Sequence, residues 1–175
     1  MNLKELEINK SNAEITYNDL LCCQEWKEKR QEIFKRDEFK CSNCKRKRTF
    51  KMWSGGKAMY FELNKIEPQE NESLIRSKEP INLEVHHNYY ILNNFPWEYD
   101  DIALICVCRE CHQEIHDNNK IPVWDQNKLN MLEFGPCDRC VGKGYLKEYK
   151  HVENGRCFKC SGSGYNLPFK FKPRT

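Results

Sequence analysis

Two short segments of the chain hold four of its five histidines. His86 and His87 are adjacent in the run Leu-Glu-Val-His-His, and His112 and His116 lie in Cys-Arg-Glu-Cys-His-Gln-Glu-Ile-His. Residues four apart share one face of a helix, so the imidazoles of His112 and His116 can reach one metal ion. Adjacent strand residues point to opposite faces, so at most one of His86 and His87 joins that ion. The other imidazole, with an ordinary pKa of about 6.5, is free to take a proton from water. The pattern predicts three metal ligands and a general base.

Four cysteines flank the histidine strand. Cys41 and Cys44 precede it, and Cys108 and Cys111 follow it, each pair with the spacing Cys-x-x-Cys. Two such pairs are typical of a structural zinc site with four thiolate ligands. Either pair alone also occurs as a redox motif or by chance, but their position around the histidines favours zinc. We expect this clamp to hold the start of the histidine-bearing helix against the segment before the strand.

The chain from about residue 17 to 117 resembles the HNH endonucleases of the ββα-metal superfamily. The resemblance is carried by Trp-Lys-Glu-Lys-Arg at 26–30, Ile-Phe-Lys-Arg-Asp-Glu-Phe-Lys-Cys-Ser-Asn-Cys at 33–44, Val-His-His at 85–87, Pro-Trp-Glu-Tyr at 96–99 and Ala-Leu-Ile-Cys-Val-Cys-Arg-Glu-Cys-His at 103–112. It implies that His87 is the general base and that His86 and His112 bind the catalytic metal. His116 is then the third ligand, as in the colicin nuclease domains.

One position departs from this family. An asparagine usually precedes the apolar run of the second strand and braces the loop that carries the base, whereas Ala103 stands there. Asp100 or Asp101 is the candidate replacement for that brace. The substitution bears on the orientation of His87 and leaves the ligands in place.

The resemblance also implies a reaction. The metal held by His86, His112 and His116 stabilises charge on the scissile phosphate and the leaving oxygen while His87 deprotonates water, which yields a 5′ phosphate and a 3′ hydroxyl. A ligand set of imidazoles favours zinc, nickel, cobalt or manganese, although magnesium is abundant in cells and stays open as the working ion.

The C-terminal part contains an internal repeat, Cys-x-x-Cys-x-Gly-x-Gly-Tyr. Its four cysteines satisfy one tetrahedral zinc and its glycines let backbone amides approach the thiolates: Cys137, Cys140, Cys157 and Cys160. The repeat resembles the cysteine-rich zinc modules of DnaJ-type co-chaperones over residues 137–165. That resemblance implies a zinc-binding β-hairpin module and little about chaperone activity.

Length and composition predict two small units that need metal. The chain has 175 residues, 39% of them hydrophobic. We expect an α+β fold: a small ββα-metal (HNH) domain at 1–118 with a core at about 17–117, a linker at 119–136, and a zinc module with a basic tail at 137–175. The N-terminus has no apolar run typical of a signal peptide, and no segment is typical of a membrane span. We therefore expect a cytoplasmic protein with reduced cysteines, eight of them in two structural zinc sites, and Cys22, Cys23 and Cys106 as small buried residues.

The net charge of +3 does not by itself indicate a nucleic-acid partner, but basic residues cluster directly after the first Cys-x-x-Cys pair. We predict phosphate contacts from this run, which comprises Lys45, Arg46, Lys47 and Arg48. The C-terminal Lys170, Lys172 and Arg174 form either a second basic patch or a solvated tail.

The elements that must position these residues follow from hydrophobic periodicity. We expect one amphipathic helix over residues 18–35, strands at 58–63, 83–87 and 102–107, and a helix at 110–118. The helix over residues 18–35 is expected to bury Leu20, Leu21, Trp26, Ile33 and Phe34. Trp124 is the candidate for packing the zinc module against the nuclease core.

Two classes of function stay open. The favoured one is a metal-dependent DNA endonuclease, of use to a phage, a mobile element or a defence system. The other is a degenerate zinc-stabilised module that binds nucleic acid or protein. A co-chaperone fragment is disfavoured because the chain lacks a helical segment with His-Pro-Asp. RNA as substrate, a homodimer and a targeting partner protein stay open.

Overall fold

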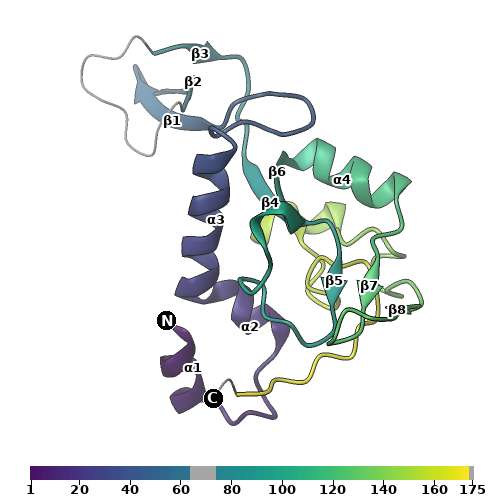
Figure 1. The fold of residues 1–175 in the computed structure, drawn as a ribbon. Helices are drawn as coiled ribbons and strands as arrows, with labels where there is room; N and C mark the ends of the chain where they lie inside the picture. The colour runs from purple at the N-terminus through teal and green to yellow at the C-terminus, as the bar shows by residue number, and fades with distance from the viewer. Residues whose placement is uncertain (64–73, 174–175) are drawn as a thin grey trace.

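Side-chain caps start the first two helices of the chain. The computed structural model describes residues 1–63 and 74–173 (Figure 1). Asn2 and Thr16 each accept a hydrogen bond from the backbone N–H three residues later, and so begin α1 (Leu3–Asn9) and α2 (Tyr17–Cys22). Both form a capping box with the acidic residue at that third position, which satisfies donors that a helix end otherwise leaves free.

The helix expected over residues 18–35 is two helices in the structure. Cys23 separates α2 from α3 (Gln24–Arg36) with an extended backbone, φ −68° and ψ 155°. Its thiol is fully buried in an apolar cluster that also contains Leu6 and Phe95. The prediction of a single helix was wrong because the hydrophobic periodicity continues across this break and gives no sign of the extended backbone at Cys23. The burial of Cys23 itself was predicted.

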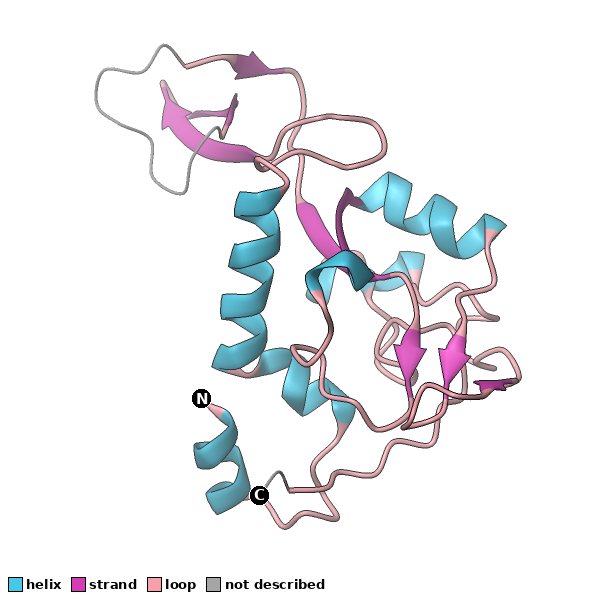
Figure 2. Cartoon of the chain, viewed as in Figure 1, coloured by secondary structure: helices cyan, strands magenta, loops and turns pink. Residues whose placement is uncertain are grey.

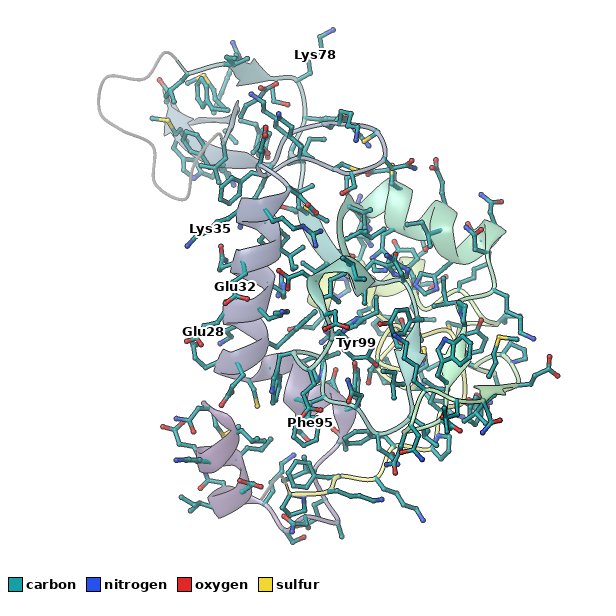
Figure 3. All side chains as sticks on the ribbon, in the orientation of Figure 1. Glu28, Glu32, Lys35, Lys78, Phe95 and Tyr99 are labelled. Carbon is teal, nitrogen blue, oxygen red and sulfur yellow. The ribbon has the colours of Figure 1, made fainter. Side chains whose placement is uncertain are left out.

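α3 is amphipathic. Its buried side includes Trp26, Ile33 and Phe34, as predicted. Glu28, Glu32 and Lys35 project away from the rest of the molecule on its opposite side (Figure 3). The helix therefore presents one apolar stripe to the central strands.

Residues 45–82 contribute a small antiparallel sheet at the C-terminal end of α3 (Figures 1 and 2). β1 (Thr49–Ser54) pairs with β2 (Lys57–Glu62), and β2 pairs with β3 (Arg76–Ser77). The strand expected at 58–63 is β2, whereas β1 was not predicted. Gly55 and Gly56, both with positive φ, form the two-residue turn that joins these strands and are the signal that would have identified the hairpin. The sequence also has a charged stretch at 68–80, and its first part, 68–73, lies outside the described residues, as does Arg174.

Two strands and a helix form the centre of the fold. β4 (Leu83–His87) and β6 (Leu104–Cys108) pair antiparallel, and α4 (Arg109–Asn118) starts directly after β6. A 3₁₀ turn, η1 (Asp101–Ala103), leads into β6. The core between α3 and this unit consists of buried apolar residues from all these elements, among them Phe34, Val85, Tyr99, Leu104 and Val107.

The predicted linker at 119–136 carries two short strands. β5 (Tyr90–Ile91) pairs in parallel with β7 (Val123–Trp124), which pairs with β8 (Met131–Leu132). Ile121 and Val123 are buried with Tyr90, and residues after the second Cys-x-x-Cys repeat pack on them: Tyr165 and Leu167. These buried aliphatic residues, rather than the partly exposed Trp124, form the cluster that joins the C-terminal part to the rest.

The C-terminal part has little regular secondary structure (Figure 2). Isolated bridges join Pro136 to Tyr165 and Tyr145 to Arg156, and two 3₁₀ turns, η2 (Lys147–Tyr149) and η3 (Glu153–Gly155), lie between the cysteine pairs. The regular β-hairpin expected here is therefore reduced to single bridges, because the turns around the cysteines occupy most of the backbone.

The tail after the second repeat returns to the N-terminal helices (Figure 1). Phe171 is buried against Leu6 and Leu20, and its ring stacks on Phe95 at 5.4 Å between centroids. The expected alternatives for this tail, a basic patch or a solvated segment, overlooked its apolar anchor.

The architecture is mixed α+β, in agreement with the sequence. Within residues 1–63 and 74–173, no helix combines the length and the apolar character needed to cross a membrane.

Candidate metal centre

Three of the four clustered histidines converge at the junction of β4 and α4. Nitrogens of His86, His112 and His116 lie within 4.8 Å of one another. The ring of His86 is 4.9 Å from that of His112 and 5.0 Å from that of His116, measured between centroids. The single helical turn between His112 and His116 aims both rings at the strand, as their spacing predicted.

The nitrogens of this cluster are suited to a metal ion. Both ring nitrogens of His86 and Nε2 of His116 are buried without a hydrogen-bond partner among the described residues. Burial, followed by the neighbouring imidazoles, lowers the pKa of His86 to about 2 and that of His116 to about 4. Buried polar atoms are normally paired, and three imidazoles whose nitrogens lie this close together could hold one metal ion. Three nitrogen donors favour zinc or a neighbouring transition metal, while magnesium prefers oxygen.

Glu84 orients one of the three ligands. Its Oε2 lies 2.6 Å from Nδ1 of His112, which donates the hydrogen bond and so leaves Nε2 of that ring for a metal. Burial acts to raise the pKa of Glu84, but the contact with His112 and the positive charge of Arg109 and Arg30 outweigh it, so the pKa is lowered. A carboxylate behind a ligating histidine fixes its tautomer. Glu84 was not predicted as part of this site, although its place two residues before His86 puts both on one strand face.

His87 points the other way and is held by contacts of its own. Its Nε2 lies 3.0 Å from the carbonyl oxygen of Pro96, and its ring stacks on Trp26 at 5.1 Å between centroids. A carbonyl only accepts, so Nε2 carries the hydrogen and Nδ1 carries the lone pair. Burial lowers the pKa of His87 to about 4, against a raising effect of the Pro96 contact, and keeps the imidazole neutral near pH 7.

The brace expected from Asp100 or Asp101 is provided elsewhere. Asp101 forms an ion pair with Lys29 of α3 at 2.6 Å, and Ala103 is buried. The carbonyl of Ala103 accepts a hydrogen bond from the backbone N–H of Asn88 at 2.8 Å, which fixes the chain directly after the histidine pair. The ring of His87 is oriented by the backbone carbonyl of Pro96. The residue type at position 103 therefore gave no information about this contact.

The first four-cysteine group fits a structural zinc ion. It joins the loop after α3 to the end of β6 and the first turn of α4 through Cys41, Cys44, Cys108 and Cys111. The sulfurs of Cys44 and Cys108 are 3.6 Å apart. Zinc–sulfur bonds of about 2.3 Å in a tetrahedron place sulfurs about 3.8 Å apart, so the spacing agrees.

Arg46 covers this group. Its guanidinium donates to Sγ of Cys44 at 3.3 Å and to Sγ of Cys108 at 3.2 Å. Burial acts to raise the pKa of the Cys44 thiol, but the hydrogen bonds from Arg46 lower it to about 6, which favours the thiolate that zinc needs. Glu79 and Glu110 pair with the same guanidinium at 3.0 and 2.9 Å.

The rest of the predicted phosphate-binding run also has partners within the chain. Lys45 donates to the carbonyl of Ser42 at 2.7 Å, Lys47 pairs with Glu62 at 3.5 Å, and Arg48 lies over the ring of Phe34. None of the four lines the cavity at the histidine cluster. Their contact with phosphate stays a prediction, and two of the four, Lys45 and Arg46, contact the first cysteine loop.

The second group, Cys137, Cys140, Cys157 and Cys160, also fits zinc. The sulfurs of Cys137 and Cys157 are 4.0 Å apart, and those of Cys140 and Cys160 are 3.7 Å apart. The backbone N–H of Gly144 donates to Sγ of Cys140 at 3.2 Å, as the glycine pattern predicted.

The two halves of this repeat cross at their glycines. Gly144 and Gly164 have φ of +66° and +80°, and a Cβ on either would lie 2.3 Å from the carbonyl oxygen of Gly162 or Gly142 respectively. Larger residues would therefore be both strained and in collision with backbone.

The remaining cysteines differ from one another. Cys23 and Cys106 are buried, which raises the pKa of their thiols to about 11 and about 12, whereas Cys22 is exposed and was predicted wrongly as buried. His151 is exposed between the two halves of the repeat.

A cavity of about 150 Å³ lies over the histidine cluster. One part of its lining is the four clustered histidines, His86, His87, His112 and His116. Another part comes from the C-terminal repeat (residues 137–165), called the second cysteine repeat below, through Lys143, Gly144, Tyr145, Arg156, Ser161 and Gly162. A Cβ on Gly144 would lie only 3.5 Å from Cε1 of His116. The sequence predicted a separate zinc module, and spacing alone could not show that this module packs against the candidate metal centre.

Comparison of the chain with protein-family models, with curated proteins and with solved structures found no match.

Proposed function

We propose that the protein is a metal-dependent endonuclease of the HNH type, which hydrolyses phosphodiester bonds in DNA. The observation that carries the proposal is the convergence of His86, His112 and His116 at a cavity that His87 also lines. The paired strands β4 and β6 followed by α4 have the element order of a ββα-metal fold. A purely structural zinc site has no need of the fourth imidazole.

Each histidine has a defined part in this reaction. His86, His112 and His116 hold the divalent ion, with Glu84 keeping Nδ1 of His112 protonated. When bound, the ion supplies positive charge that stabilises the phosphate as it becomes five-coordinate and the leaving 3′ oxygen as it departs.

His87 acts as the general base. With Nε2 held by Pro96, its Nδ1 accepts a proton from water. The oxygen of that water forms a bond to phosphorus, and the bond from phosphorus to the 3′ oxygen breaks. The 3′ oxygen leaves with the bonding electrons and takes a proton from solvent water. The products are a 5′ phosphate and a 3′ hydroxyl.

Cleavage of supercoiled plasmid tests the proposal. Purified protein, with zinc at both cysteine groups verified by metal analysis, is assayed in magnesium, manganese, nickel or zinc beside His87→Ala. His151→Ala is the matched control because that histidine is exposed and does not line the cavity. We expect nicking or linearisation that the control retains and His87→Ala loses by on the order of 100-fold or more.

The second candidate is a binding module without catalysis. The replacement of the family asparagine by Ala103 favours it. A binding module predicts that wild type and His87→Ala are equally inactive in every metal, while both still retard DNA on a gel. That outcome would reject the nuclease in favour of the binding module.

A further inference from the structure

Cationic side chains from both parts of the molecule surround the cavity. Arg30 comes from α3 and Arg109 from the first turn of α4, while Lys143 and Arg156 come from the second cysteine repeat. The acidic residues that line the same cavity are Glu84 and Glu153. Glu84 is hydrogen-bonded to His112, and four cationic side chains line the cavity against two acidic ones. The lining therefore carries an excess of positive charge without any metal ion.

Besides the nitrogens of His86 and His116, two buried polar atoms at this cavity have no partner among residues 1–63 and 74–173. They are the hydroxyl of Tyr17 and Nη2 of Arg109. The guanidinium of Arg109 lies 4.6 Å over the ring of Tyr145, another residue of the repeat, which fixes its position. Buried donors are normally hydrogen-bonded, so the Tyr17 hydroxyl and the Arg109 guanidinium are placed to donate to a ligand in the cavity, and the charge of Arg109 favours an anion.

Arg156 attaches the repeat to the helices. Its Nη2 donates to Oδ1 of Asn18 in α2 at 3.1 Å and lies 3.3 Å from Oε2 of Glu153. Glu153 is largely exposed, so water screens its charge more than that of the buried donors. The repeat is thereby held where its cations face the histidine cluster across the cavity.

We propose that the C-terminal cysteine repeat completes a phosphate-binding subsite beside the histidine centre, with Lys143 and Arg156 as its contribution. Tyr17 and Arg109 supply the opposing donors. The ligand is a backbone phosphate of nucleic acid, because a tetrahedral anion accepts from donors that converge from several directions and fits a cavity of about 150 Å³. The proposal rests on the proposed function and gives the second zinc module a direct part in binding substrate.

Equilibrium binding without catalysis tests this subsite. Full-length protein with both cysteine groups loaded, and without added divalent ion, is titrated against a short fluorescein-labelled single-stranded DNA by anisotropy. We expect Lys143→Ala and Arg156→Ala each to weaken binding on the order of tenfold and to reduce the salt dependence by about one phosphate contact. Arg156→Lys, which keeps the charge but not the planar fork, should fall between wild type and Arg156→Ala.

Two residues of the same module are matched controls. Arg139 lies over Phe158 and Lys159 pairs with Asp138, and neither lines the cavity. Arg139→Ala and Lys159→Ala should bind within about twofold of wild type, since their contacts are exposed ones. Lys143→Ala leaves the hydrogen bond between Arg156 and Asn18 in place, so a change in that variant reports on binding and not on docking of the module.

The outcomes separate the two proposals. If Lys143→Ala and Arg156→Ala, with unchanged zinc content and melting temperature, bind and cut DNA as well as wild type does, the subsite is wrong and the nuclease stands. If wild type cuts no DNA in any metal but the variants lose affinity as expected, the nuclease fails and the phosphate subsite stands. If all four alanine variants lost DNA affinity equally, the subsite would be wrong, and the overall positive charge of the module would account for binding.

Discussion

The two four-cysteine groups have the same ligands but are built in different ways. The first takes Cys41 and Cys44 from a loop and Cys108 and Cys111 from a strand end and a helix, so it joins segments far apart in the sequence. The second takes both pairs from a repeat with a spacing of 20 residues and has almost no regular secondary structure around it. A zinc ion in the first group would therefore hold elements that carry the histidine centre, and one in the second group would hold a wall of the cavity.

The largest effect should come from breaking the first group. Cys108→Ser removes a zinc ligand at the junction of β6 and α4, and the helix with His112 and His116 loses its anchor. We expect destabilisation of at least about 4 kcal/mol, together with loss of plasmid cleavage. Thermal unfolding and zinc content measure this. Cys22→Ser, at an exposed cysteine, is the control and should behave as wild type.

Breaking the second group should be less destructive. Cys157→Ser should release one zinc and leave the core around α3, β4 and β6 folded, because that core contains no residue of the repeat. Cleavage should fall on the order of tenfold as Lys143 and Arg156 lose their fixed positions. Circular dichroism and metal analysis give the readout. If Cys157→Ser instead unfolded the whole chain cooperatively, the second group would be as necessary to the central core as the first.

Glu84→Gln separates the histidine centre from both cysteine groups. Removing the charge behind His112 should weaken metal binding at the histidines by about 10- to 100-fold, with both cysteine-bound zinc ions retained. Calorimetric titration with manganese checks this. Glu114→Gln, at an exposed position on the same helix, should have no effect. Equal metal affinity in the two variants would mean that Glu84 does not support a ligand.

The smallest effect concerns the crossing of the repeat. Gly144→Ala places a methyl group 2.3 Å from the carbonyl oxygen of Gly162 at a φ of +66°, and should cost about 1–2 kcal/mol in the stability of the module. Gly135→Ala is the control because a Cβ there meets nothing within 4 Å. The concentration of chelator that removes half of the zinc measures the difference. If both variants resist chelation equally, the glycine crossing contributes nothing to the second group.

The metal-ligating residues could be predicted because they occur in pairs a few residues apart in the sequence. The spacings at Cys41, Cys108 and His112 are local, and they identified groups whose atoms the fold does bring together. Contacts between distant segments have no such signal. The placement of Gly144 against His116, the extended backbone of Cys23 between two helices and the hydrogen bond from His87 to Pro96 all depend on packing that no local pattern encodes.

The return of Phe171 to α1 and α2 makes the second cysteine repeat a loop fixed at both ends. Ile121 and Val123, which precede the repeat, pack with Tyr165 and Leu167 at its end, and Phe171 further along the chain packs against Leu6. A tethered segment keeps a high effective concentration near its docking surface, because only the entropy of a closed loop has to be overcome. Once its zinc has been lost, the module should thus fold back onto its docking surface in a unimolecular step, at a rate independent of protein concentration.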